Sequence, residues 1–403
     1  MPIPATSSSP KKLLDKALRC RNAGDVDGAI GHLRQLVGQA PRHLDGNFFL
    51  GTFLAEKGDL GEGRRYLAKA RELDPRSIQV LNNLGNLLRM LGEAEEALGC
   101  YQRATDIDPS FVHGWVNLGF IHSKLERWQD CLDSFRRVGG EHCADVDILR
   151  TMANAARQLG QAELASRLYG RVLELDPADR HGAAVILAAL GRQALPDRHT
   201  DGMVREAYRQ KAAGWDRDVD RPGDSYFGPD HLRRLLEPRL PAGGVDILDL
   251  GCGTGNCGPF LAPAARRLVG VDLSPEMLAQ AAGKGLYGEL VEDEIGAYLA
   301  AADGLFDVVA GAGVFIMFSR LEDIFAAVAA RLKPGGLFAL TLYRAAAGDI
   351  EIRHNDHFGH SRAYAERAAA GSGFETVAIE EVVHETANGE DQPGYALLLR
   401  RPA

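Results

Sequence analysis

A glycine-rich turn flanked by carboxylates is the part of the sequence best suited to chemistry. Residues 246–255 read Asp-Ile-Leu-Asp-Leu-Gly-Cys-Gly-Thr-Gly, which predicts a strand that runs directly into a tight turn and then a helix. Glycines let the backbone bend sharply and approach a ligand, and the first turn of a helix presents unpaired N–H groups. The segment is therefore predicted to bind a nucleotide-like cofactor.

The glycine spacing alone does not identify this cofactor. Gly253, Gly255 and Gly258 satisfy the dinucleotide pattern GxGxxG, and Asp272 follows at a distance suited to a ribose. Asp249 favours a different ligand, because a carboxylate beside the turn would repel a pyrophosphate. S-adenosylmethionine carries an ammonium and a sulfonium and no phosphate, so the sequence predicts S-adenosylmethionine rather than NAD.

Residues after the next strands extend the predicted cofactor site. Asp272 can accept hydrogen bonds from both ribose hydroxyls, and Ser274 would cap the following helix. In the acidic cluster 292–294, Asp293 could take the adenine amino group, or the cluster could be only a solvated helix start. The predicted strand 306–311 ends in small residues, which suits close passage of the methionine part. The expected cofactor-binding residues of these segments are Asp249, Gly251, Cys252, Gly253, Gly255, Asp272, Leu273, Met277, Asp293, Ala310 and Gly311.

The elements that must position these residues alternate between strand and helix. Strands are predicted at 246–250, 268–272, 306–311, 337–342, 375–382 and 395–399, with one more strand, the third in order, directly before the acidic cluster 292–294. Helices that precede the sheet are predicted at 203–215 and 229–235. Strand, helix, strand in sequence predicts an α/β Rossmann-like domain with a mostly parallel sheet and helices on both faces. The last two strands have no helix between them, so the sheet should end in an antiparallel hairpin.

The first half of the chain repeats with a fixed period. Pro41, Pro75 and Pro109 are spaced by 34 residues, and Pro177 continues the series two periods later, with Cys143 at the position between. This frame predicts an all-α solenoid of about five helical hairpins. Small residues recur where two helices of a hairpin would cross, namely Ala17, Gly51, Gly85, Gly119 and Ala153 in the first helices and Ala29, Gly63, Ala97, Cys131 and Ala165 in the second.

This pattern resembles the tetratricopeptide repeat over about residues 10–178, with a cap helix at 180–190. Such arrays form a concave surface that receives extended peptides. Asn83, Asn86 and Asn117 lie on the first helices of repeats three and four, where their amides could hold the backbone of a bound protein or peptide. The alternative is that these amides are ordinary surface polar residues.

The second half of the chain resembles the class I methyltransferase family, through residues 249–255, Asp272 and the turn at 333–337. The whole chain looks like bacterial predicted methyltransferases that carry tetratricopeptide repeats. The resemblance implies cofactor contacts for the turn residues and Asp272, and a cofactor-covering role for Tyr208 and Trp215 on a lid helix.

Two positions depart from the pattern of this family. Relatives commonly show an acidic residue and a tyrosine just beyond the fourth strand, where this chain has Gly313 and Met317. That region usually borders the methyl acceptor. We therefore expect a different substrate or weakened turnover.

A general base would help if the acceptor is a hydroxyl. His354, His357 and His360 follow the fifth strand, where an acceptor pocket is expected, and His360 is the preferred candidate because it has a family counterpart. Tyr226 and Tyr364 are the further catalytic candidates. The alternative is that His360 only structures the start of a helix. No metal site is expected, because the three histidines lack a matching carboxylate.

The composition restricts the classes of molecule that the chain is expected to bind. The chain has a formal net charge of -9, and its six cysteines form no CxxC pair. Clustered Lys and Arg would be needed to hold nucleic acid, so a nucleic-acid substrate is not expected. The sequence shows no apolar segment of membrane-spanning length and no secretory signal, which predicts a cytoplasmic protein without disulfides or structural zinc.

These observations predict four segments. They are a flexible leader at 1–9, a repeat domain at 10–192, a linker with a lid helix at 193–224 and a methyltransferase domain at 225–403. The predicted function is methyl transfer from S-adenosylmethionine to an unidentified acceptor, with the repeats recruiting a protein. Two alternatives remain: an enzyme acting on a small molecule or glycan whose repeats serve assembly, and a non-catalytic adaptor that binds S-adenosylmethionine.

Overall fold

The chain divides into two compact units, Met1–Arg171 and Val172–Ala403. The computed structural model describes residues 9–218, 220–221, 224–241, 243–353, 356–387 and 389–403. The division falls within a helix, Ala162–Leu175, and thus earlier in the sequence than the expected boundary after residue 192. The expected leader at 1–9 lies almost wholly outside the described residues, as does His354.

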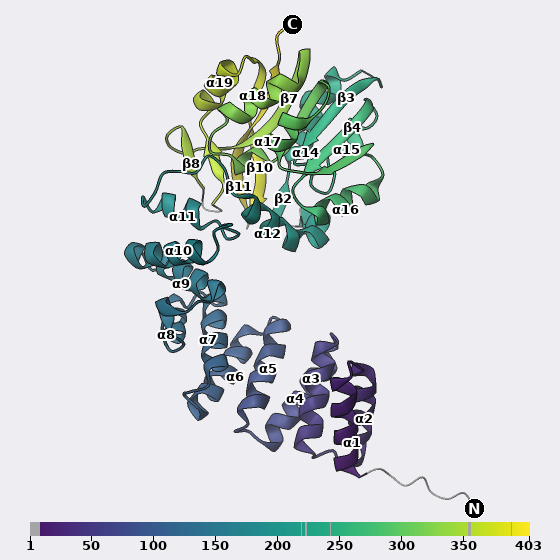
Figure 1. Cartoon of the computed structure of the whole chain (residues 1–403), viewed down its shortest axis with the longest axis vertical. Helices are drawn as coiled ribbons and strands as arrows, with labels where there is room; N and C mark the ends of the chain where they lie inside the picture. The colour runs from purple at the N-terminus through teal and green to yellow at the C-terminus, as the bar shows by residue number, and fades with distance from the viewer. Residues whose placement is uncertain (1–8, 219, 222–223, 242, 354–355, 388) are drawn as a thin grey trace, which may run out of the picture. The chain divides into compact units, whose positions relative to one another are not determined.

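The first unit is built from antiparallel helical hairpins, coloured purple to blue in Figure 1. The helices are α1 (Pro10–Asn22), α2 (Val26–Gln39), α3 (Leu44–Glu56), α4 (Leu60–Leu73), α5 (Ile78–Met90), α6 (Ala94–Ile107), α7 (Val112–Lys124), α8 (Trp128–Arg136), α9 (Val146–Gln158) and α10 (Ala162–Leu175). The five predicted hairpins are therefore present. In the hairpin without its proline, α8 has only nine residues and a short 3-10 helix, Gly140–His142, follows it.

Small residues let the two helices of each hairpin approach closely. A Cβ atom added to Gly51 on α3 would lie 2.8 Å from the backbone nitrogen of Leu67 and 2.9 Å from the carbonyl oxygen of Gly63 on α4. On α7, a Cβ at Gly119 would lie 2.4 Å from the ring of Phe135 on α8. Gly51 is thus required by the distance between helix backbones, and Gly119 by the ring that packs over it.

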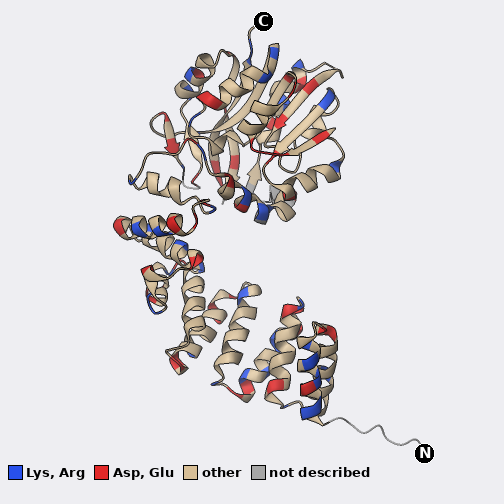
Figure 2. Cartoon of the chain, viewed as in Figure 1, with Lys and Arg blue, Asp and Glu red and all other residues tan. Residues whose placement is uncertain are grey.

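Positively and negatively charged residues are both present along the repeat helices, blue and red in Figure 2. Some pair between neighbouring repeats, such as Arg64 with Glu93 at 2.7 Å and Arg127 with Glu95 at 2.8 Å. Such exposed ion pairs contribute about 0 to 1 kcal/mol each. The buried small residues and apolar side chains must therefore supply most of the stability of the array.

The second unit contains one mixed sheet. Its described strands are β1 (Asp220–Arg221), β2 (Asp224–Tyr226), β3 (Val245–Leu250), β4 (Ala265–Asp272), β5 (Glu289–Glu292), β6 (Phe306–Gly311), β7 (Leu332–Arg344), β8 (Ile350–Ile352), β9 (Phe358–His360), β10 (Glu375–Ala387) and β11 (Glu390–Arg400). The order is β1-β2-β10-β11-β7-β6-β3-β4-β5, with β9 paired to β7 and β8 to β9. Strands β7, β6, β3, β4 and β5 are parallel, and β10 and β11 form the predicted antiparallel hairpin.

The helices of this unit follow the predicted order. They are α11 (Ala183–Ala189), α12 (Asp201–Lys211), α13 (Trp215–Asp218), α14 (Gly228–Leu236), α15 (Gly258–Leu261), α16 (Pro275–Lys284), α17 (Ile295–Ala301), α18 (Glu322–Arg331) and α19 (Arg362–Gly371), with a 3-10 helix η4 at Phe315–Met317. The predicted helix 203–215 is broken between α12 and α13 by a 3-10 turn, Ala212–Gly214. The strands β1, β2, β8 and β9 were not predicted, because runs of two or three residues carry no readable periodicity.

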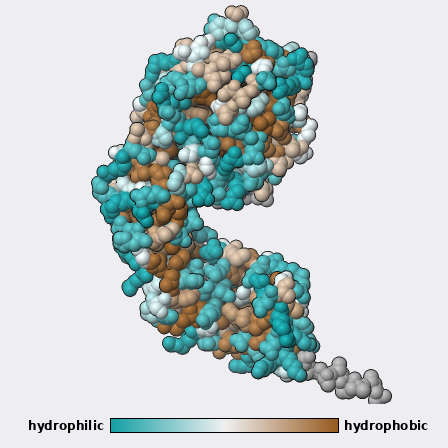
Figure 3. All heavy atoms as spheres, in the orientation of Figure 1, coloured by the Kyte–Doolittle hydropathy of each residue, from teal (hydrophilic) through white to brown (hydrophobic). Residues whose placement is uncertain are grey.

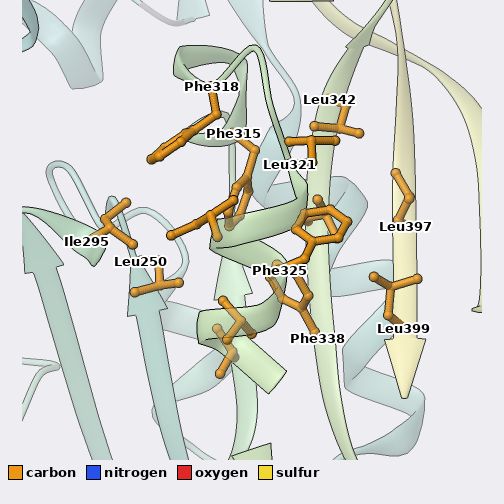
Figure 4. Close-up of a cluster of buried hydrophobic side chains, with 14 of the residues drawn as sticks. Leu250, Ile295, Phe315, Phe318, Leu321, Phe325, Phe338, Leu342, Leu397 and Leu399 are labelled. Atoms are coloured by element: carbon orange, nitrogen blue, oxygen red, sulfur yellow. The ribbon is translucent and has the colours of Figure 1, made fainter. Parts of the chain in front are cut away.

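A cluster of phenylalanine rings anchors the segment after β6 (Figure 4). The ring of Phe338 on β7 lies 5.3 Å from Phe315 and 5.4 Å from Phe325, both edge to face. These rings are buried, and they hold η4 against the sheet. The backbone between Gly311 and Met317 is therefore fixed at the carboxyl ends of the parallel strands.

Hydrophilic residues dominate the face of the molecule shown in Figure 3. Among the helices that the structure describes, none combines the length and the apolar character needed to cross a bilayer. The six cysteines are unpaired.

Two glycine substitutions separate close helix crossing from helix propensity. Gly51→Ala should lower the free energy of unfolding by about 2 kcal/mol, because the new methyl group meets backbone atoms of α4 that cannot move aside. Gly99→Ala, on the exposed face of α6 with no atom within 4 Å of the added Cβ, should raise it by about 0.5 to 1 kcal/mol. Denaturant unfolding followed by circular dichroism measures both. Equal effects of the two substitutions would contradict the packing argument.

Candidate active site

The glycine turn after β3 is locked by the carboxylate at the end of β4. Asp272 accepts a hydrogen bond from the backbone nitrogen of Gly253 at 2.9 Å and another from that of Ser274 at 2.9 Å. Ser274 also caps α16, as predicted, by accepting from the backbone nitrogen of Met277. One carboxylate thus fixes both the turn and the start of the next helix.

The turn leaves open space above Gly253. Gly251, Gly253 and Gly255 have positive φ angles of 63°, 54° and 84°, which side-chain-bearing residues rarely adopt. A Cβ added to Gly253 would have no atom within 4 Å, whereas one at Gly251 would meet the side chain of Val314 at 2.5 Å. The backbone of Gly253 is therefore the part of the turn that a ligand can approach.

A cavity of about 570 Å³ lies beside this turn. Nine of the residues predicted to act here line it, namely Tyr208, Trp215, Tyr226, Gly251, Cys252, Gly253, Asp272, Leu273 and Met277. A volume of this size suits a cofactor-sized ligand. The structure thus brings most of the predicted site together, and the contacts of these residues with a cofactor stay a prediction.

Asp249 lies beneath the cavity rather than on its wall. Its side chain is buried, and one oxygen accepts a hydrogen bond from the Tyr287 hydroxyl at 2.6 Å. Burial raises the pKa of Asp249 to about 7, the Tyr287 hydrogen bond opposes this rise, and the charge of Asp272 adds to it. The carboxylate that the cavity presents directly is therefore Asp272, whose own pKa is also raised by burial.

Tyr287 is a site residue that the sequence analysis did not assign. Its ring also packs against the turn, because a Cβ added to Gly255 would lie 2.9 Å from it. Tyr287 follows α16 and comes from a part of the chain remote from Asp249. The spacing of residues around Asp249 therefore could not identify it.

The predicted lid is tied directly to the glycine turn. Tyr208 on α12 and Trp215 at the start of α13 contact each other with ring centroids 5.7 Å apart, and both line the cavity. Next to Trp215, Asp216 accepts a hydrogen bond from the Thr254 hydroxyl and pairs with the Lys284 ammonium at 2.7 Å. These contacts place Trp215 over the turn.

Several predicted cofactor residues lie outside the cavity wall. Asp293 accepts a hydrogen bond from the backbone of the next residue, Glu294, and it is Glu294 that lines the cavity. Ala310 is fully buried in the sheet. Gly311 is small for a packing reason, because an added Cβ would lie 2.5 Å from the ring of Phe315. Both residues thus have a packing role in the core, and passage of the methionine part beside them stays a prediction.

The structure does not bring His360 or Tyr364 to the cavity. His360 is fully buried, donates from Nε2 to the backbone oxygen of Ser319 at 3.1 Å, and stacks on Tyr364. Tyr364 donates to Glu322 at 2.8 Å and accepts from the backbone nitrogen of Leu321 at 3.0 Å. These hydrogen bonds hold β9 and α19 against the segment after η4. The expected catalytic contact is therefore corrected to a structural role for both residues.

The opposite end of the cavity is formed by residues that the sequence analysis did not single out, together with Tyr226 and His357. Tyr343 on β7 and His384 and Glu385 on β10 line it. Tyr343 donates a hydrogen bond to Glu385. Among the described residues, no group of three His, Cys, Asp or Glu side chains is placed to hold a metal ion.

In the repeat unit, the predicted amides form a connected row. Asn83 donates to the Thr52 hydroxyl on the preceding hairpin at 3.1 Å, and Asn117 donates to Asn82 at 2.8 Å. Asn86 instead accepts from a tyrosine hydroxyl within its own hairpin. All of these amides are half-buried.

Family models match both units. Residues 247–336 match the methyltransferase domain, and residues 46–110 match the tetratricopeptide repeat. Nocamycin O-methyltransferase of Saccharothrix syringae is 38% identical over 132 residues, which cover 30% of this chain and 46% of that protein. Ubiquinone biosynthesis O-methyltransferase of Thiobacillus denitrificans is 36% identical over 133 residues, which cover 30% and 56%. The chain thus spans about half the length of these curated relatives.

Solved structures of both kinds are also similar to the chain. The match to the MamA protein covers 46% of this chain and 97% of the MamA chain, with a TM-score of 0.39 and 19% identity. Magnesium protoporphyrin IX methyltransferase of Synechocystis covers 50% and 99%, with a TM-score of 0.40 and 16% identity. From the two family matches, the chain carries tetratricopeptide repeats followed by a methyltransferase domain.

Proposed function

We propose that this protein transfers a methyl group from S-adenosylmethionine to an acceptor bound in the 570 Å³ cavity. The observation that carries the proposal is the carboxylate of Asp272, which lines the cavity beside the open backbone of Gly253. Each carboxylate oxygen keeps a lone pair after accepting from the backbone, so Asp272 can still accept from two ribose hydroxyls.

The charge around the turn supports a cationic ligand. Asp249 and Asp272 are both buried or nearly so, and both pKa values are raised, which means that ionised carboxylates are disfavoured there. A ligand with an ammonium and a sulfonium would offset this effect, and a pyrophosphate would increase it. Asp249 and Asp272 therefore favour S-adenosylmethionine over NAD, even though Asp249 is buried and does not line the cavity.

S-adenosylmethionine supplies a methyl group on a positively charged sulfur, so the reaction needs alignment more than side-chain catalysis. In this chain, Asp272 and the glycine turn would hold the nucleoside, and Tyr208 and Trp215 would cover it. Asp216 keeps Trp215 in place through Thr254. Exclusion of water by this lid would favour transfer to the acceptor over hydrolysis.

Asp272→Asn should weaken the binding of S-adenosylmethionine at least tenfold, because the amide removes the charge and one acceptor. Isothermal titration calorimetry of the full chain measures this. Asp323→Asn, an exposed carboxylate at the start of α18, is the matched control and should bind as the wild type does. No binding by the wild type would sink the proposal. Equal binding by Asp272→Asn, with an unchanged melting temperature, would remove the assigned role of Asp272.

The affinity for S-adenosylmethionine should depend on pH through Asp249. In the free protein, burial raises the pKa of this carboxyl to about 7. A bound cation would lower that pKa, so binding releases a proton below neutral pH, and the affinity should rise up to tenfold per unit between pH 5.5 and 7. Calorimetry at several pH values should show this slope for the wild type and for Asp323→Asn. A slope of the same size in Asp249→Asn would contradict it.

We also propose that the repeats recruit a protein or peptide. The support is the tetratricopeptide match and the half-buried row of amides that runs across α3, α5 and α7 through Thr52, Asn83, Asn82 and Asn117. Amides at regular spacing along a concave array can pair with an extended backbone without reading its sequence.

The names of the similar curated proteins do not restrict the acceptor to one kind of atom. Two are O-methyltransferases, one is a ubiquinone/menaquinone biosynthesis C-methyltransferase, and one is an 18S rRNA (guanine-N(7))-methyltransferase. The protein that the repeats recruit is, under this proposal, either the methyl acceptor or a scaffold. Peptide binding tests both cases, because it does not depend on methyl transfer.

The double substitution Asn83→Ala, Asn117→Ala should abolish the enrichment of peptides from a random library displayed against the full chain. The affinity of any enriched synthetic peptide should fall about tenfold, because each lost amide removes a hydrogen bond to the peptide. Gln158→Ala, an exposed amide at the end of α9, is the control. If the wild type enriches no peptide, or if the double variant keeps the same affinity, the peptide-binding role of these amides is wrong.

A further inference from the structure

We infer that the end of the cavity formed by β2, β7 and β10 binds a small planar aromatic acceptor whose hydroxyl oxygen hydrogen-bonds to Tyr226. This end, named here the acceptor end, is lined by Tyr226, Tyr343, His357, His384 and Glu385. The inference rests on the proposed function, because it assigns the end near Gly253 and Asp272 to S-adenosylmethionine.

The two ends of the cavity lie far apart along the sheet. Asp272 ends β4, whereas His384 and Glu385 lie near the end of β10, five strand steps away in the order β10-β11-β7-β6-β3-β4. Neighbouring strands are about 4.8 Å apart, so these five steps span about 24 Å of the sheet edge. One cofactor bound at the glycine turn therefore leaves the β7 and β10 end for a second molecule.

Aromatic rings follow one another along this end. Ring centroids lie 6.4 Å apart for Trp215 and Tyr226, 5.5 Å for Tyr226 and His384, 4.5 Å for His384 and Tyr343, and 6.3 Å for Tyr343 and His357. Aromatic pairs interact favourably at such spacings. The rings are tilted against one another and together make an aromatic wall, which favours an aromatic ligand over an aliphatic one.

The Tyr226 hydroxyl lacks a hydrogen-bond partner among the protein groups that the structure describes, although it is buried. Burial also raises the pKa of Tyr226 well above its usual value, so the group stays a neutral hydroxyl. Leaving a buried hydroxyl unpaired costs about 1 to 3 kcal/mol in the free protein. A group that remains unpaired on a cavity wall points to a ligand atom as its partner.

Glycines on two sides make room for this hydroxyl. A Cβ added to Gly313 would lie 2.5 Å from the Tyr226 oxygen, and one added to Gly228 would lie 2.1 Å from it. Gly313 also has a positive φ of 66°. The glycine that departs from the family pattern is therefore the residue that admits Tyr226, and Gly313 follows the strand beside the glycine turn. The hydroxyl thus lies on the side of the acceptor end that faces the cofactor end.

His384, on the aromatic wall of the acceptor end, is a poor base. It is fully buried, its Nε2 shares a hydrogen bond with the Thr341 hydroxyl, and burial lowers its pKa to about 3. An acceptor hydroxyl that is already acidic does not need His384 as a base, because it can lose its proton to water. Its oxygen lone pair then forms the bond to the methyl carbon while the bond from sulfur to that carbon breaks, and the sulfur leaves as a neutral thioether. Tyr226 would donate to the same oxygen and orient it.

Protocatechualdehyde, a flat catechol with an acidified hydroxyl, is the probe for the full chain in the presence of S-adenosylmethionine. Transfer of labelled methyl should be fastest to this aldehyde, slower to catechol and undetectable to cyclohexanediol, which has the same adjacent hydroxyls on a puckered ring. Methylation of the diol at the rate of the aldehyde would overturn the inference. So would failure of the aldehyde to react or to bind while calorimetry shows that S-adenosylmethionine binds. Failure of S-adenosylmethionine itself to bind marks the separate failure of the proposed function.

Tyr226→Phe keeps the ring and removes the hydroxyl. It should raise KM for protocatechualdehyde about tenfold, leave the affinity for S-adenosylmethionine unchanged and keep or raise the melting temperature, because no protein hydrogen bond is lost. A purely structural tyrosine would instead lower the melting temperature without changing KM. Tyr298→Phe on α17, away from the cavity, is the matched control and should leave KM unchanged. An unchanged KM in Tyr226→Phe overturns the role of the hydroxyl.

Discussion

The carboxylate of Asp272, held between two backbone N–H groups, is the interaction on which the catalytic unit depends. It joins the turn after β3 to the start of α16, so the backbone that meets a cofactor and the helix that supports it cannot move separately. A second hydrogen bond lies beneath the same turn, where the Tyr287 hydroxyl donates to the buried carboxylate of Asp249. The cavity floor is therefore preorganised by two carboxylates that the protein itself disfavours in their ionised form, which is a reason for such a site to prefer a cationic ligand.

Local spacing explains what could be predicted. The proline interval, the paired small residues and the glycine turn are short-range patterns, and each corresponds to one element or one hairpin of the structure. Residues brought together by long-range pairing could not be predicted in this way. Tyr226 reaches the cavity because the three-residue strand β2 pairs with β10, where Tyr226 lies opposite Glu385. His360 was selected for its side-chain type and its place after the fifth strand, but pairing of β9 with β7 turns it into the core.

Charged side chains are exposed in the repeat unit and partly buried in the catalytic unit. On the repeats, Arg and Glu side chains pair across the exposed surface, where each pair contributes little and the small residues between helices set the architecture. In the catalytic unit, carboxylates are buried against hydroxyl and amide donors, and their protonation depends on that burial. The distinction follows from the folds themselves: a solenoid has a shallow interior, whereas a sheet covered on both faces has depth enough to perturb an ionisable group.

The link between Asp216, Thr254 and Lys284 joins the covering segment to the very loop that it covers. Opening that segment would require the ion pair between Asp216 and Lys284 to break. Because both side chains are partly exposed, added salt would screen this pair and ease the opening.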